Sequence, residues 1–312
     1  FYAGDQWVDL ARNPLFAYFL AARSALGLDK WIHYFEIYDM HLSRFRGTDV
    51  KVLEIGTFKG GGLAMLREYL GPQAQLVGMD IDPVAVESIR DQFTVVLGDQ
   101  EDPESLRRIS EEFGPFDVVI EDGGHTMKQQ IITAETLFPL LNDGAVYLSE
   151  DLHTSYWEEY GGGLKSPDTF IEWIKDRVDD INGYHAGTGH GGSYGTTDYV
   201  NNWTRTVGGL HLYDSVVVID KKRVAPPFAE LSGTFHYLRE NRFEASAVVD
   251  IEQARDMAVN ELNRVRAENE EELTRVRAEN EQGLNKLERR QAKAEAELRQ
   301  LKESKSWQLT KP

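Results

Sequence analysis

The chain of 312 residues contains no cysteine, and this absence excludes disulfides, thiolate metal sites and cysteine nucleophiles together. A long apolar run is also missing. The longest one near the N-terminus, residues 15–22, is too short to span a bilayer and lacks the basic flank of a signal peptide. We therefore expect a cytoplasmic protein without a transmembrane segment. Because the chain starts at Phe1 and stops soon after Trp307, we also expect a fragment of a longer chain.

Basic residues are scarce relative to acidic ones. The chain has 34 lysines and arginines against 52 aspartates and glutamates, which gives a formal charge of -18. Residues 251–312 contain 13 residues of each sign, so the whole acidic surplus lies on residues 1–250. A surface this acidic repels phosphate backbones, and nucleic acid is not expected as a partner.

The distribution of apolar residues divides the chain into four parts. Residues 1–47 show aromatic and aliphatic side chains at helical spacing and are predicted to form a helical flank. In residues 48–225 short apolar runs alternate with helical stretches, which predicts an α/β fold with a doubly wound, Rossmann-like sheet. Residues 226–250 are predicted to be a linker. Within the second part, the Gly-rich stretch around His190 has turn chemistry without periodicity and is a candidate lid.

A glycine-rich loop, "VLEIGTFKGGG" at residues 52–62, follows the first predicted strand. Glycine lets the backbone approach a ligand, and the helix N-terminus that follows favours a negative group. A triphosphate-binding loop requires Gly-Lys-Ser/Thr, but Lys59 is followed only by glycines, so that ligand is excluded. A dinucleotide and S-adenosylmethionine both remain, because Asp80 ends the second predicted strand where either ligand would place a ribose-binding acid.

Three features favour S-adenosylmethionine over a dinucleotide. Glu54 precedes Gly56 within the strand, and Asp99 ends the third predicted strand, where an acid that contacts adenine is expected. The Tyr-x-x-x-Lys pair of short-chain hydride-transfer enzymes is absent. We therefore predict S-adenosylmethionine as the cofactor, with a nicotinamide oxidoreductase as the alternative.

Acidic residues follow the next two predicted strands. Asp122 and His125 lie in "VVIEDGGH", and Glu150 and Asp151 lie in "VYLSEDLHTSYW". Because ligands bind beyond the carboxyl ends of strands in such sheets, we expect these four side chains to gather near the cofactor. Crowded carboxylates repel one another unless a cation joins them, and an all-oxygen set suits Mg²⁺.

Simpler roles remain possible for these residues. Glu121 or Asp122 can cap the following helix, and His125 can be a hydrogen-bonded loop histidine. Glu150 and Asp151 can form a solvated turn. The aromatic residues that follow are equally compatible with a core role and with a substrate wall: Tyr156, Trp157 and Tyr160.

Three strings that occur together are specific: "GPFDVVIEDGGH", "LFPLLNDGAVYLSEDLHTSYW" and "YGGG". With "GLDKWIHYFEIYD", "LEIGTFKGGG" and "GDQEDPESL", they make the chain resemble the macrolide-sugar O-methyltransferases, a class I S-adenosylmethionine-dependent family. The likeness covers roughly residues 27–165 and extends more loosely to Lys222. Because the glycine loop looks shorter than in the macrolide enzymes and the stretch around His190 has no counterpart, the acceptor need not be a macrolide.

The resemblance implies a role for each site residue. It implies His125 as the general base, acting with Asp122, while Mg²⁺ assists loss of the proton from a sugar hydroxyl. The implied metal ligands are Asp122, Glu150 and Asp151. The implied cofactor residues are Glu54, Gly56, Gly60, Asp80, Asp99 and Gln100. The implied substrate residues are His153, Tyr156 and Trp157.

The C-terminal part, residues 251–312, is predicted to be a coiled coil. "ELNRVRAENE" and "ELTRVRAENE" repeat at a spacing of eleven residues, which predicts nearly straight or right-handed supercoiled strands in a dimer or trimer. A methyltransferase with such a tail resembles the chain-terminating enzymes of bacterial O-antigen assembly. That second resemblance implies a surface-polysaccharide sugar as acceptor, glycosyltransferases as partners and a peripheral location at the inner membrane. The alternatives are an antibiotic deoxysugar acceptor and a non-catalytic scaffold.

Overall fold

The computed structural model describes residues 10–21, 26–186 and 199–228, together with residues 255–256, 259–260, 263–264 and 267. The chain divides into two units, residues 1–230 and 231–312. The described residues of the second unit are helical. The Gly-rich stretch around His190 and nearly all of the predicted linker and coiled coil lie outside the described residues. The fold below is that of the first unit.

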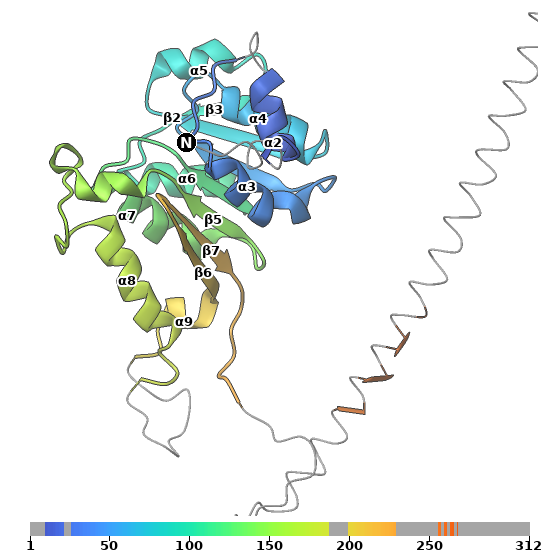
Figure 1. Ribbon diagram of the computed structural model, residues 1–312, viewed down its shortest axis with the longest axis vertical. Helices are drawn as coiled ribbons and strands as arrows, with labels where there is room; N and C mark the ends of the chain where they lie inside the picture. The colour runs from blue at the N-terminus through green and yellow to red at the C-terminus, as the bar shows by residue number, and fades with distance from the viewer. Residues whose placement is uncertain are drawn as a thin grey trace, which may run out of the picture. The chain divides into compact units, whose positions relative to one another are not determined.

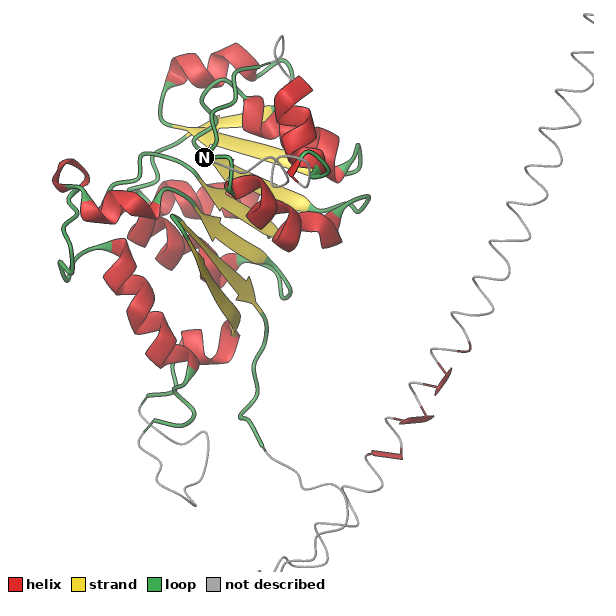
Figure 2. Cartoon of the chain, viewed as in Figure 1, coloured by secondary structure: helices red, strands yellow, loops and turns green. Residues whose placement is uncertain are grey.

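One seven-stranded sheet, yellow in Figure 2, forms the centre of this unit, in the order β3-β2-β1-β4-β5-β7-β6. Five strands run parallel, and the last two form an antiparallel hairpin whose second strand pairs with β5. The strands are β1 (Lys51–Ile55), β2 (Gln75–Asp80), β3 (Thr94–Leu97), β4 (Val118–Glu121), β5 (Val146–Ser149), β6 (Val207–Tyr213) and β7 (Val216–Lys221).

Helices cover both faces of the sheet (Figure 1). One face packs against α2 (Pro14–Ala21), α3 (Tyr34–Leu42), α4 (Gly61–Leu70) and α5 (Pro83–Ile89). The other packs against α6 (Pro103–Phe113), α7 (Met127–Leu137), α8 (Phe170–Ile181) and α9 (Asn202–Thr206). Short 3-10 turns complete the fold: η1 (Ser43–Phe45), η2 (Phe138–Leu140), η3 (Leu152–Tyr156) and η4 (Glu158–Tyr160). Each central strand is apolar on both sides because both of its faces are covered.

Local sequence signals explain where several helices begin. Asp82 and Asp102 each accept a hydrogen bond from a backbone N–H two residues ahead, and a proline occupies the first turn of the helix that each one caps. Thr126 and Gln129 form a capping box at the start of α7. These caps end the loops that follow β2, β3 and β4, so they fix the loops at the carboxyl edge of the sheet.

The strand order reverses between β1 and β4, which lie side by side. In doubly wound sheets the crevice at such a switch point is the ordinary ligand site. The predicted Rossmann-like sheet is therefore confirmed. Within the described parts of the chain, no helix combines the length and apolar character that a membrane span requires.

Candidate active site

Two cavities of about 280 and 330 Å³ open at this switch point. They share four lining residues, so they form one continuous cleft: Gly56, Phe58, Asp122 and Gly123. The smaller cavity extends over the ends of β2 and β3, and we call it the nucleoside cavity. The larger extends toward the end of β5, and we call it the acidic cavity.

Asp80 lines the nucleoside cavity from the end of β2. One carboxylate oxygen, Oδ2, accepts hydrogen bonds from the Phe58 backbone N–H at 3.0 Å and the Thr57 hydroxyl at 3.3 Å. The other, Oδ1, accepts from the Asp82 backbone N–H at 2.9 Å. Asp80 therefore fixes the glycine-rich loop and also faces the cavity where the sequence predicted a ribose.

The two predicted cofactor glycines have different tasks. Gly56 has φ +87°, and a Cβ there would lie 1.9 Å from the backbone oxygen of Asp122, so only glycine allows the loops that follow β1 and β4 to approach this closely. Gly60 has φ +77° at the start of α4 and lines neither cavity. The structure thus gives Gly60 a conformational role, apart from the cleft.

Asp99 and Gln100 both line the nucleoside cavity. The Gln100 amide donates to Glu121 Oε1 at 2.8 Å, and its oxygen accepts from the Gly124 backbone N–H at 3.0 Å. Gln100 therefore holds the loop after β4 in place. Glu121 is fully buried and also accepts from the Ser149 hydroxyl at 2.6 Å, so it joins β4 to β5, while its neighbour Asp122 faces the cleft.

Glu54 lines the acidic cavity although its side chain is buried. Among the described residues, its Oε2 has no hydrogen-bond partner. Burial raises the pKa of the Glu54 carboxyl to about 8, and the nearby Lys30 ammonium only partly opposes this shift. The carboxyl is therefore largely protonated at neutral pH in the folded protein without ligands.

This raised pKa predicts how stability varies with pH. Between about pH 4.5 and pH 8, folded Glu54 keeps a proton that the unfolded chain has lost, so its contribution to stability decreases as pH rises. Glu54→Gln removes this contribution. In ligand-free protein, the melting temperature of the variant relative to wild type should increase from pH 5 to pH 9 in calorimetry. Parallel curves for the two proteins would contradict the raised pKa.

Three side chains around the acidic cavity form a candidate metal centre: Asp122, His125 and Asp151. One donor atom from each lies within 4.8 Å of the others. His125 Nε2 is 3.8 Å from Asp122 Oδ1 and 3.4 Å from Asp151 Oδ2. His125 and Asp151 have φ of 57° and 55°, a conformation that non-glycine residues rarely adopt and that often marks functional sites.

Glu150 lies beside these residues, but its carboxylate has protein partners. Its Oε1 accepts from the buried Lys30 ammonium at 2.7 Å and from the Tyr38 hydroxyl. The same ammonium also forms an ion pair with Asp122. Of the predicted metal ligands, the structure thus places Asp122 and Asp151 next to His125, while Glu150 pairs with Lys30 and Tyr38 through Oε1, so Oε2 is the oxygen that could still bind a metal ion.

Lys30 and Trp31 belong to the site but were not predicted from the sequence. They line the acidic cavity from the loop before α3, whose Tyr34 hydroxyl also donates to Asp151 Oδ1 at 2.7 Å. The run "DKWIHY", in which charged and aromatic residues lie side by side, was the available signal. The predicted flank therefore supplies one wall of the site.

The predicted substrate residues lie at the edge of the cleft and line neither cavity. The His153 ring contacts the rings of Trp31 and Trp157, with centroids 5.5 and 4.6 Å apart. Trp157 is 44% and Tyr156 is 49% exposed, which favours an open surface over the core role that the sequence left open. Trp31 connects this aromatic surface to the acidic cavity.

Comparison with known proteins shows what this domain is similar to. Residues 53–152 match the family model described as a methyltransferase domain. Demethylmacrocin O-methyltransferase of Streptomyces fradiae is 34% identical over 205 residues, which are 62% of this chain and 50% of that protein. The 8-demethyl-8-alpha-L-rhamnosyl tetracenomycin-C 2'-O-methyltransferase of Streptomyces olivaceus is 35% identical over 206 residues, 63% of this chain and 52% of that protein.

The fold has a solved counterpart as well. The MycE methyltransferase from the mycinamycin biosynthetic pathway, in complex with Mg and SAH, aligns with a TM-score of 0.57 and 29% identity over 68% of this chain and 55% of that one. The chain spans about half the length of the curated relatives it matches. The resemblance to macrolide-sugar O-methyltransferases is confirmed for this domain, and the likeness to O-antigen chain-terminating enzymes finds no support among these relatives.

Proposed function

We propose that this chain is an S-adenosylmethionine-dependent, magnesium-assisted O-methyltransferase that acts on a sugar hydroxyl of a glycosylated small molecule. The observation behind the proposal is the centre of Asp122, His125 and Asp151, which opens into the same cleft as the nucleoside cavity. Relatives named for demethylmacrocin and for a rhamnosyl tetracenomycin favour the antibiotic-sugar alternative over the surface-polysaccharide acceptor that we expected first.

The residues of the cleft fit both groups that the proposal requires. Asp80 and Asp99 offer carboxylates to the ribose and adenine of S-adenosylmethionine, which supplies the methyl group when bound. A divalent cation held by Asp122 and Asp151, with Oε2 of Glu150 as a further oxygen, would stabilise negative charge on the acceptor oxygen. Magnesium and SAH in the similar MycE structure support this assignment.

The protein's own part is to accept the proton and to orient the acceptor. His125 Nε2 faces Asp122 and Asp151, and Nδ1 is buried without a hydrogen-bond partner among the described residues. An imidazole is the usual proton acceptor near neutral pH, so we propose His125 as the general base. The rings of Trp31, His153 and Trp157 would contact the apolar face of a sugar and hold its hydroxyl toward His125.

Asp80→Ala is expected to weaken S-adenosylmethionine binding by about 1.5 to 3 kcal/mol, since a charged hydrogen-bond acceptor is lost. Titration calorimetry measures the change. Glu87→Ala is the matched control, because this exposed acid on α5 pairs with Arg90 and lies outside the cleft. Equal affinities for Asp80→Ala and wild type would remove Asp80 from the cofactor site.

The acceptor class is tested by a methyl-transfer assay read by mass spectrometry. The panel contains rhamnosylated small molecules, nucleotide sugars and surface-polysaccharide fragments, with S-adenosylmethionine as the donor. A gain of one methyl group on the glycosylated small molecules is expected. Methylation of the polysaccharide fragments alone would instead support a surface-polysaccharide sugar as the acceptor. Binding of NAD in place of S-adenosylmethionine would favour an oxidoreductase, and binding of neither would favour a scaffold.

We also propose residues 48–225 as the catalytic domain. The family match at residues 53–152 and all seven strands, from Lys51 to Lys221, fall within these bounds. Self-association through residues 251–312 stays a proposal that rests on the eleven-residue repeat.

A further inference from the structure

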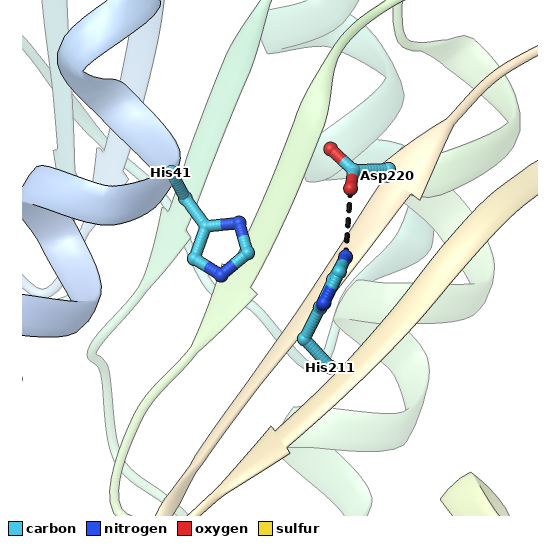
Figure 3. A group of neighbouring side chains, drawn as sticks. All are labelled: His41, His211 and Asp220. Carbon is cyan, nitrogen blue, oxygen red and sulfur yellow. Dashed lines mark hydrogen bonds and ion pairs between the residues drawn. The ribbon is translucent and has the colours of Figure 1, made fainter.

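A second group of side chains of the types that bind metal ions lies away from the cleft. His41 comes from α3, His211 from β6 and Asp220 from β7 (Figure 3). Asp220 pairs with Val146 at the start of β5, whereas Glu150 follows the end of that strand. Four residues of strand separate these two levels by about 13 Å, so this group is distinct from the acidic cavity.

The three side chains converge because of strand register and helix packing. Asp220 pairs with Gly209, two residues before His211, so His211 and Asp220 point to the same face of the hairpin. That face carries Val216 and Val218, which belong to the same apolar cluster as Tyr38 and Leu42 of α3. Helix α3 therefore lies over this face and places His41, which is buried, against His211.

The donor atoms are close enough for one ion. His211 Nε2 lies 2.9 Å from Asp220 Oδ2, the two imidazole centroids are 4.7 Å apart, and one donor atom of each of the three residues lies within 4.8 Å of the others. Ligands on a tetrahedral zinc with bonds of about 2.0–2.1 Å lie about 3.4 Å apart, so small side-chain shifts suffice.

Neighbouring groups orient the donors as outer partners do in metal sites. The Tyr213 hydroxyl lies 2.8 Å from His41 Nε2 and 3.2 Å from Met40 Sδ, so metal binding would use the tautomer in which His41 Nε2 donates to this hydroxyl. In that tautomer the other nitrogen of His41 has its lone pair available. Arg44 donates to Asp220 Oδ1 at 3.0 Å, which leaves Oδ2 directed at His211. Ligating histidines and carboxylates commonly have such partners.

We propose that His41, His211 and Asp220 form a second metal site, one that takes a first-row transition ion such as Zn²⁺. Two imidazole nitrogens with one carboxylate oxygen match the ligands of zinc, whereas magnesium prefers oxygen alone. The ion would join α3 to the β6–β7 hairpin. Because α3 also carries Tyr34 and Tyr38, which hold Asp151 and Glu150, the ion would steady one wall of the acidic cavity.

The test uses tag-free protein of full length, stripped with chelator, in an Asp122→Asn/Asp151→Asn background that disables the other centre. Titration with Zn²⁺ should show about one ion bound per chain and a rise in melting temperature. Adding His211→Asn should weaken Zn²⁺ binding by at least about 100-fold, since loss of an outer partner alone costs 10- to 100-fold. The control His33→Asn, at the start of α3 and outside the group, should bind as the background does.

X-ray absorption of the zinc-loaded background needs no further substitution, so it decides the matter even if His211→Asn folds poorly. Two imidazole ligands are expected. Zn²⁺ binding that is undiminished in His211→Asn, an absence of saturable binding, or a zinc shell without imidazole would overturn the proposal and leave a hydrogen-bonded His–Asp pair.

Discussion

Asp122→Asn is expected to abolish methyl transfer while S-adenosylmethionine still binds. Asparagine keeps the size of the side chain but removes the charge that attracts a divalent cation, and a neutral amide is a weaker metal ligand than a carboxylate. Asp122 is central because Lys30 and His125 both face it, and it lines both cavities. Mass spectrometry measures turnover, and calorimetry measures cofactor binding.

The matched control is Asp91→Asn, an exposed aspartate after α5 that lies outside the cleft and should keep wild-type turnover. Excess chelator should have the same effect on wild type as Asp122→Asn. Turnover that persists in chelator would exclude a metal role, and unimpaired turnover of Asp122→Asn would remove Asp122 from the centre.

His125→Ala should reduce turnover by about 10²- to 10⁴-fold, the usual contribution of a general base. Without His125 the proton of the sugar hydroxyl has no positioned acceptor. His125 does not line the nucleoside cavity, so that cavity stays unchanged. Steady-state kinetics should therefore show a fall in kcat with little change in the affinity for S-adenosylmethionine.

Backbone strain is the competing explanation, since His125 has φ 57°. Asparagine tolerates this conformation better than alanine, so His125→Asn separates the two causes. If His125→Asn is as slow as His125→Ala, the loss is chemical. Recovery of turnover in His125→Asn would show that His125 only shapes the loop.

The cleft was predictable to the extent that strand ends determine it. Alternating apolar and helical segments specify a parallel sheet, and such a sheet brings the ends of β4 and β5 together wherever they lie in the sequence. Asp122 and Asp151 were found in this way. The adjacent acids Glu121 and Asp122 were harder to assign, because only the structure shows that Glu121 turns inward to Ser149.

The parts of the site that were not predicted depend on tertiary contacts that no local sequence pattern encodes. Lys30 contacts Asp122, which is 92 residues away in the sequence, and Glu150, which is 120 residues away. Its own segment shows only a helical pattern. Which loop crosses the sheet edge is decided by the packing of α3, and that packing depends on apolar residues scattered over the whole sheet. The group of His41, His211 and Asp220 was not predicted for the same reason. Its members lie in three different elements, and no local sequence pattern shows that these elements meet.

Lys30 determines whether the acidic cavity can form before any metal ion binds. Buried carboxylates such as Glu150 are costly to assemble without a nearby positive charge. Lys30, as part of the chain, supplies part of that charge without a bound ion, so the site can fold before an ion binds. Under the proposed function, a shortage of magnesium is therefore expected to lower the rate of methyl transfer without lowering the amount of folded protein.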